Sequence, residues 1–139
     1  MKIRIPIRPV SFLIAGITAG IIFANGTARA EQLPSVLIKA LKEGNAIALS
    51  PFLAEQVELT LPDQECTCTA AKTQQLLSKF FSVYPALNYY TIHEGNNDEY
   101  KYAIGMYTST AGKYRFFILL KESGSQNYIH QIRIDKTDE

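Results

Sequence analysis

The sequence predicts a single α+β domain in which helices cover one face of an antiparallel sheet. Two stretches with a helical apolar stripe lie between residues 33 and 84, and a two-residue alternation of side chains dominates residues 87–134. The chain has 139 residues, of which 47% are hydrophobic and 19% charged, and these values are ordinary for one globular domain. We therefore expect one core, preceded by a removable leader.

The leader is predicted at residues 1–30, which have the three-part layout of a secretory signal peptide. A basic segment, residues 2–8, precedes an apolar stretch over residues 10–24, and the small-residue sequence Ala28-Arg29-Ala30 follows. The apolar stretch is shorter than the roughly 20 residues that span a bilayer, which argues against an uncleaved anchor. We expect cleavage after Ala30 and an exported protein, periplasmic or secreted.

The charge of the remaining domain limits its partners. Four of the 14 Lys and Arg residues, and none of the 13 Asp and Glu residues, lie in residues 1–30. The domain after the leader is therefore slightly acidic and lacks a basic run, so we expect no nucleic-acid partner. It also lacks an apolar stretch of bilayer-spanning length, so we expect no membrane span after cleavage.

The first helix is predicted directly after Pro34, because a first helical turn accepts proline. Gly44 is suited to end this helix. Asn45 is suited to cap a second, shorter helical piece, which Pro51 must kink or restart. The amphipathic spacing i, i+3, i+4, i+7, i+8 is formed by Leu33, Val36, Leu37, Ala40 and Leu41.

A strand and a third helix are expected next. Every second side chain is apolar over residues 56–61, which is typical of a half-buried strand, and residues 64–67 could form a brief returning strand. Thr69 is a suitable N-cap for a helix that ends before Pro85. One face of that helix carries Leu76, Leu77, Phe80 and Phe81.

Four antiparallel strands are predicted after this helix, separated by clusters of Gly, Asn, Asp and Ser. They are Leu87–Glu94, Tyr100–Thr110, Lys113–Lys121 and Asn127–Ile134. The element order is thus helix, helix, strand, helix, and then a four-strand antiparallel curved sheet. The polar tail, residues 137–139, is expected to fray.

Five segments carry a resemblance to a known superfamily: Ala40–Ala46, Val57–Leu61, Phe80-Phe81, Tyr102–Gly105 and Ile129–Ile134. In these segments the chain resembles the nuclear transport factor 2-like superfamily, whose ketosteroid isomerase-like and cystatin-like members form cones. It is most similar to a family of short exported proteins of Gram-negative bacteria of unknown function. The resemblance covers nearly all of residues 33–136 and implies one domain over residues 31–136.

The resemblance implies a cone with its helices on the concave face, a cavity between helices and sheet, and dimerisation through the sheet. Relatives serve as enzymes, ligand binders or association modules, so the fold alone does not define the function. Isomerase relatives hold a carboxylate base inside the cavity. Here Glu58 lies out of phase with the apolar face and the other strand-region carboxylates fall at turns or strand ends. We therefore expect a non-catalytic module without a cofactor.

The alternative is an isomerase- or dehydratase-like enzyme that uses His130. This residue shares its alternation phase with Ile132 and Ile134, so it is predicted to face the cavity, where a neutral imidazole could transfer a proton. A core histidine satisfied by a tyrosine hydroxyl is the simpler interpretation. Tyrosines of the sheet could line a pocket for a small apolar ligand or peptide, or could reflect strand propensity alone. The ligand-binding candidates are His130, Tyr128, Tyr102 and Tyr114.

A sheet-mediated homodimer is predicted from the strand Lys113–Lys121. Phe117 and Leu119 alternate with Arg115 and Lys121, on the face opposite the other apolar residues. That face would otherwise be exposed to water, so its apolar side chains indicate contact with the sheet of a second copy. The candidates for the dimer face are Phe117, Leu119, Arg115 and Arg133.

Cys66 and Cys68 are separated by one residue. They could be two partly buried thiols, a redox pair, half of a metal site or an intermolecular bridge. A bridge between them is expected to need a turn, because Cα atoms two apart in a regular strand lie near the ~7 Å limit for a disulfide. No metal site is predicted, since Cys66, Cys68, His93 and His130 lack a zinc-type spacing.

Overall fold

The structure is a computed structural model that describes residues 33–138. The predicted signal peptide, residues 1–30, lies outside the described residues. The helices are α1 (Ser35–Glu43), α2 (Ala46–Leu49) and α3 (Ala70–Val83), with a 3-10 turn η1 (Ser50–Phe52). The strands are β1 (Leu53–Thr60), β2 (Glu65–Thr69), β3 (Ala86–Asn96), β4 (Tyr100–Ser109), β5 (Gly112–Ser123) and β6 (Gln126–Thr137).

All six strands belong to one sheet in the order β2-β1-β6-β5-β4-β3. Strand β1 runs parallel to β6, whereas every other neighbouring pair is antiparallel. The predicted four-strand sheet is therefore too small, because β1 and β2 extend it beyond β6. An unpaired β6 would leave its backbone groups without partners on one side, and β1 supplies them.

The helix ends and caps agree with the sequence prediction. Gly44 adopts a left-handed conformation with φ of 61° and ends α1. The backbone N–H of Ala48 donates to Asn45 Oδ1 over 3.1 Å at the start of α2. The N–H of Lys72 donates to Thr69 Oγ1 over 3.2 Å at the start of α3. These caps fix where the helices begin and end.

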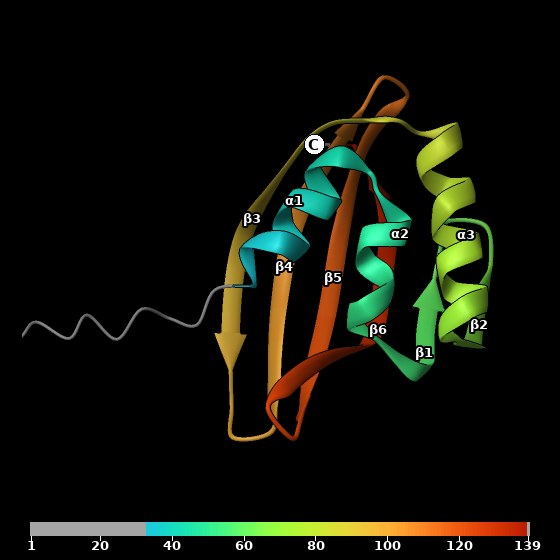
Figure 1. Cartoon of the computed structure of the whole chain (residues 1–139). Coiled ribbons are helices and arrows are strands. Elements are labelled where there is room, and N and C mark those ends of the chain that lie inside the picture. The colour runs from blue at the N-terminus through green and yellow to red at the C-terminus, as the bar shows by residue number, and fades with distance from the viewer. Residues whose placement is uncertain (1–32, 139) are drawn as a thin grey trace, which may run out of the picture.

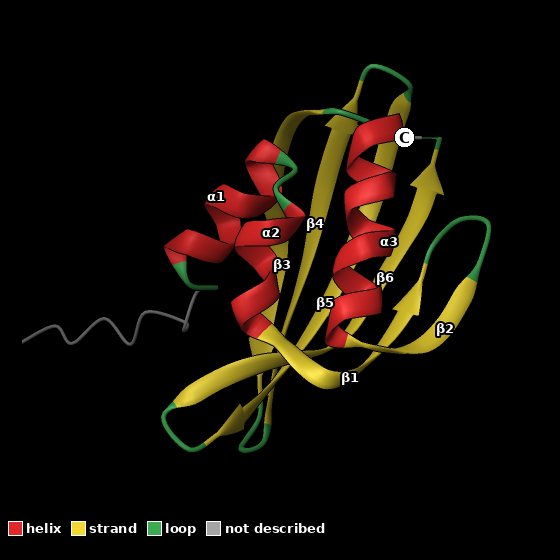
Figure 2. Cartoon of the chain, turned by 45° about the vertical axis from the view of Figure 1, so that its right-hand side comes forward, coloured by secondary structure: helices red, strands yellow, loops and turns green. Residues whose placement is uncertain are grey.

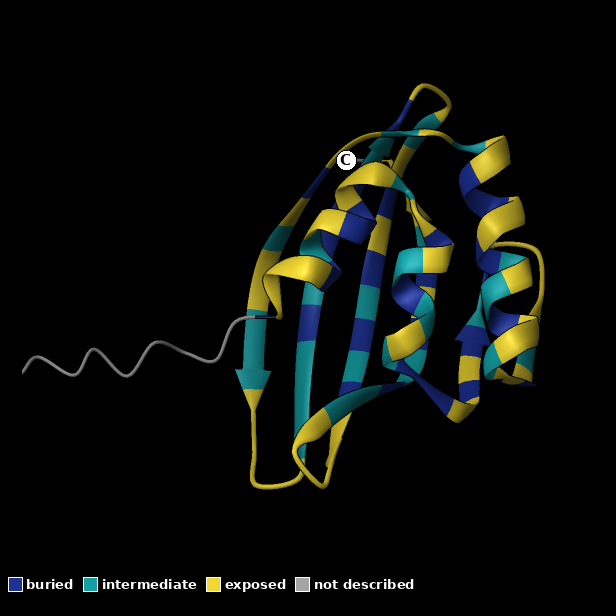
Figure 3. Cartoon of the chain, in the orientation of Figure 1, coloured by how far each residue is buried: buried dark blue, intermediate teal, exposed yellow. Residues whose placement is uncertain are grey.

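The helices pack on one face of the curved sheet, as Figures 1 and 2 show. Along β5 in Figure 3, buried residues alternate with more exposed ones, as expected for a sheet with one covered face. Strand β6 ends at Thr137, which still pairs with Lys113. The first residue of the predicted frayed tail is therefore part of the sheet.

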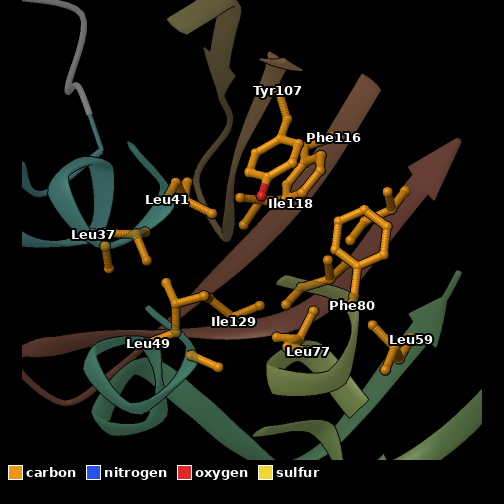
Figure 4. Packing of buried hydrophobic residues seen from close by; sticks show 14 of the residues in the cluster. Leu37, Leu41, Leu49, Leu59, Leu77, Phe80, Tyr107, Phe116, Ile118 and Ile129 are labelled. Atoms are coloured by element: carbon orange, nitrogen blue, oxygen red, sulfur yellow. The ribbon is translucent and has the colours of Figure 1, made fainter. Parts of the chain in front are cut away.

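Aromatic rings fill the space between α3 and the sheet. The Phe80 ring lies 5.1 Å from the Tyr84 ring, 5.3 Å from Tyr114 and 5.9 Å from Tyr107, measured between centroids. Tyr107 in turn stacks on Phe116 at 5.0 Å. Figure 4 shows Phe80, Tyr107 and Phe116 close together beside the aliphatic part of the core. This space is packed with side chains rather than open to a ligand.

Candidate functional site

A β-bulge in β6 decides which way its polar side chains point. Leu119 pairs with Gln131 and Leu120 pairs with Ile129, so His130 is an extra residue in the ladder. Ile129 and Ile132 are both buried in the core although they are three residues apart. His130 consequently points to the sheet face without helices, and the predicted phase that it shares with Ile132 is wrong.

We call the sheet face that carries no helix among residues 33–138 the open face. Five side chains from β4 and β5 form an apolar strip on it: Tyr102, Ile104, Met106, Phe117 and Leu119. The register places them side by side, with Tyr102 opposite Leu119 and Ile104 opposite Phe117. Met106 is only 6% exposed, yet it is not part of the helix-side core cluster. Its neighbours on the open face therefore already shield it from water.

Tyr102 is held in place at one end of the apolar strip. Its ring stacks on that of Phe117 at a centroid distance of 6.1 Å and an interplanar angle of 25°. Its hydroxyl lies 3.0 Å from His93 Nε2 in β3. The ring also occupies the space where a side chain at position 95 would stand, so Gly95 is needed there. The pair of His93 with Tyr102 was not predicted from the sequence; the available signal was Gly95, which leaves room for the Tyr102 ring.

Charged groups of both signs border the apolar strip. Arg133 Nε donates to Asp135 Oδ2 over 2.8 Å. Lys121 Nζ lies 5.7 Å from the centre of the Tyr100 ring. Arg115 pairs with Asp135 in the ladder, and Arg133 pairs with Phe117. The four candidates for the dimer face, Phe117, Leu119, Arg115 and Arg133, thus lie together on the open face.

The four ligand-binding candidates do not share one pocket. Tyr114 is buried on the helix side among the rings of Phe80 and Tyr84. Tyr128 and His130 line a surface depression of about 530 Å³. A second depression, of about 420 Å³, is bordered by His130, Glu58 and Lys121 among others, and Tyr102 borders neither. The two depressions are open to solvent, unlike the enclosed clefts that hold small molecules.

Burial raises the pKa of two core phenols further above physiological pH. It raises the pKa of Tyr107 to about 12, with a further contribution from nearby Tyr114. It also raises the pKa of Tyr89, where the Thr91 hydroxyl lowers and the Glu94 carboxylate raises the value less strongly. Tyr107 donates its hydroxyl hydrogen to the backbone oxygen of Tyr84. The Tyr107 hydroxyl therefore acts as a structural donor rather than as an acid near neutral pH.

Cys66 and Cys68 form a disulfide within β2, with their Cα atoms 5.5 Å apart. The expectation that such a bridge needs a turn is wrong, because β2 remains paired with β1 through both cysteines. Cys68 is buried, whereas Cys66 is half-buried against the edge of the core. Residues 33–138 contain no group of three or more His, Cys, Asp or Glu residues placed to hold a metal ion.

The fold defines the class of protein. Among residues 33–138, three helices on one face of a curved six-stranded sheet form an α+β domain, a fold shared with solved nuclear transport factor 2-like and cystatin-like structures. Among residues 33–138, no helix is long and apolar enough to cross a membrane. The chain belongs to the family described as "Domain of unknown function (DUF4783)", whose model matches residues 35–135.

Solved structures agree with this assignment. A DUF4783 family protein from Bacteroides ovatus has 31% sequence identity and a TM-score of 0.74, over 77% of this chain and 97% of that protein. One from Bacteroides uniformis has 30% identity and a TM-score of 0.73, over 78% and 100%. A comparison with curated proteins gave no match.

A more distant structure shares the fold alone. A candidate calcium/calmodulin-dependent protein kinase type II association domain from Thiobacillus denitrificans has 10% identity and a TM-score of 0.60. The match covers 74% of this chain and 90% of that one.

Proposed function

We propose that this chain is a non-catalytic association module that forms a homodimer through the open face of its sheet. The observation that carries the proposal is the apolar strip of Tyr102, Ile104, Met106, Phe117 and Leu119 on a face that none of the described helices covers. A second sheet laid on this strip would remove its side chains from water.

The composition of the open face supports this use. Protein interfaces combine an apolar, aromatic centre with a polar rim. Here the apolar strip, which includes the stacked rings of Tyr102 and Phe117, is the apolar part, and the Arg133–Asp135 ion pair borders it. Aromatic and arginine side chains are the residues that contribute most often to binding energy at interfaces.

A second copy of the chain is the partner that the charges favour. Around a two-fold axis the same surface meets itself, so its rim needs groups of both signs. The open face supplies Arg115, Arg133 and Lys121 together with Asp135 and Glu58. A partner of one strong charge would leave half of these groups unmatched.

The fold has a precedent for association and gives little support to the enzyme alternative. The distant neighbour from Thiobacillus denitrificans is named as an association domain. The isomerase- or dehydratase-like alternative required His130 inside a cavity with a tyrosine. The bulge in β6 turns His130 to the open face, and aromatic rings fill the space beneath α3. Neither a proton-transfer site nor an apolar ligand pocket is favoured there.

The test is the solution mass of the protein purified from a secreting host, measured by light scattering after size-exclusion chromatography. We expect a dimer, and we expect Ile104→Lys to give a folded monomer, because the ammonium would lie opposite Phe117 and His93 and would be buried without a carboxylate partner. Ile47→Lys is the matched control, since Ile47 is 70% exposed on α2, on the helix side. A monomeric wild-type protein at high micromolar concentration would contradict the proposal.

A further inference from the structure

The Cys66–Cys68 disulfide joins two cysteines of strand β2 that are separated by one residue. A disulfide stabilises a fold mainly by restricting the unfolded chain, and the effect grows with the length of the closed loop. A loop of two residues is close to the shortest that a chain can close. In addition, β1 already holds both cysteines in register, opposite Leu59 and Val57. The disulfide therefore adds little to the stability of the fold.

The disulfide and a regular strand favour different distances between the Cα atoms of residues 66 and 68. A regular antiparallel strand advances about 3.4 Å per residue, so Cα atoms two apart lie about 6.8 Å from each other. The Cα atoms of Cys66 and Cys68 are 5.5 Å apart. Reduction would let β2 extend to the regular spacing of its partner β1. The pairing of β2 with β1 consequently favours the dithiol over the disulfide.

The two sulfurs differ in their access to solvent. Strand β2 is an edge of the sheet, and Cys66 is half-buried whereas Cys68 is 6% exposed. An incoming thiolate therefore reaches Cys66 first. A thiol becomes a better leaving group when its thiolate is stabilised.

Cys68 has a chain position that suits a leaving thiolate. It directly precedes Thr69, the N-cap of the 14-residue helix α3. The first turn of α3 contains no acidic residue and includes Lys72. The partial positive charge at the start of a helix favours a thiolate, whereas burial in apolar surroundings favours the thiol, so solvent access alone assigns Cys66 as the attacked sulfur.

We propose that Cys66 and Cys68 form a thiol–disulfide exchange site that oxidises a dithiol. One thiolate of the dithiol attacks Cys66 Sγ, the bond between Cys66 and Cys68 breaks, and the Cys68 sulfur leaves as a thiolate that takes up a proton. The second thiolate of the dithiol attacks the dithiol's own sulfur in the mixed disulfide and releases Cys66, which is protonated in turn. The dithiol leaves as a disulfide, and its two electrons remain on the two cysteine thiols.

The first experiment measures how readily the disulfide is reduced. The protein purified from a secreting host is equilibrated in buffers of graded ratios of reduced to oxidised glutathione, quenched with an alkylating reagent and weighed by mass spectrometry. We expect the pair to be reduced at ratios that leave the long-loop disulfides of a folded secreted protein intact. A pair that resists reduction as strongly as those long-loop disulfides would overturn the proposal.

The second experiment locates the sulfur that is attacked. Acid quenching during reduction by glutathione, followed by peptide mapping, is expected to find the mixed disulfide on Cys66. In addition, Cys68→Ser should react with glutathione disulfide through Cys66 about tenfold faster than Cys66→Ser reacts through Cys68, because Cys68 is buried. Equal rates, or a mixed disulfide mainly on Cys68, would contradict the assigned direction. The mapping uses the wild-type chain, so it remains decisive if a variant fails to fold.

Discussion

Gly105 illustrates how a single residue can be required by a neighbour across the sheet. It lies in β4 opposite Thr91 of β3, and the ring and hydroxyl of Tyr89 occupy the space that a Cβ at position 105 would need. Tyr89 is fully buried, so it has no free direction in which to move. The glycine is present because of this close approach rather than because of a turn.

We expect Gly105→Ala to lower the free energy of unfolding by about 1–3 kcal/mol, the usual range for an overpacked core. Urea denaturation followed by circular dichroism measures the change. Glu122→Ala, at an exposed position of β5, is the control and should change stability by less than about 0.5 kcal/mol. An unchanged midpoint for Gly105→Ala would mean that Tyr89 can move aside.

The raised pKa of the Tyr107 hydroxyl makes the stability of the folded protein depend on pH in the alkaline range. Its pKa is raised from 10.0 to about 12 in the folded protein, so the folded state retains a proton that the unfolded state loses first. The stability that this group contributes is therefore fully present below about pH 10. It is lost as the pH rises toward 12.

We expect the free energy of unfolding of the wild-type protein to fall between pH 10 and pH 12, and to fall less steeply in Tyr107→Phe. The variant should also be less stable at pH 7 by about 1 kcal/mol, since it lacks the hydrogen bond to the Tyr84 carbonyl. Urea denaturation at several pH values measures both effects. A wild-type slope identical to that of Tyr107→Phe would show that other groups cause the decrease.

At the scale of elements, strand β6 shows where alternation arguments fail. Ile129, Ile132 and Ile134 are all buried, and no strict two-residue period can place all three on one face. The bulge at His130 absorbs the difference. The sequence predicted the strand correctly but placed His130 and Tyr128 on the wrong face. Within residues 126–137 the out-of-phase Ile129 indicates an irregularity, but the position of the bulge depends on how β5 pairs with β6.

Deletion of His130 should therefore be tolerated. Without it, Ile129, Gln131 and Ile132 alternate regularly, and the pairs Leu119–Gln131 and Leu120–Ile129 become consecutive. Deletion of Arg133 is the matched control, because it would turn either Ile132 or Ile134 out of the core and should cost about 2–5 kcal/mol. Thermal unfolding of both variants measures the difference, and equal destabilisation would refute the assignment of the bulge.

Prediction from sequence succeeded for elements whose signals are local. Gly44, Asn45 and Thr69 end or cap helices at the expected places, because backbone conformation and capping depend on a few adjacent residues. The parallel pairing of β1 with β6 was not predicted. These strands are about seventy residues apart, and no short-range pattern reports such a partner.

At the scale of the whole molecule, the sheet separates two kinds of surface. Its helix side holds an aromatic core, and its open side displays the apolar strip proposed to bind a second copy. The grouping of Phe117, Leu119, Arg115 and Arg133 on the open face follows from regular alternation in β5 and from its pairing with β6. The hydrogen-bonded pair of His93 and Tyr102 joins residues of β3 and β4 that are not directly opposite each other, so it lay beyond a strand-by-strand interpretation.

The predicted cleavage position lies just ahead of Leu33, where the described fold begins. The backbone N–H of Leu33 donates to Glu94 Oε1 in β3 over 3.3 Å, and Leu33 is buried. Cleavage after Ala30 would leave Glu31 and Gln32 ahead of Leu33, the first described residue. Removal of residues 1–30 should leave the contacts of Leu33 intact.

We expect the protein exported by a bacterial host to have the mass of residues 31–139. Ala30→Phe should block processing, since signal peptidases require a small residue directly before the cleaved bond, whereas the control Arg29→Gln should be processed normally. Intact-mass spectrometry of the exported and cell-retained fractions distinguishes these results. Retention of residues 1–30 in the exported wild-type protein would contradict the predicted signal peptide. The open face would then have to associate while an apolar segment remained attached beside β3, at the Leu33–Glu94 contact.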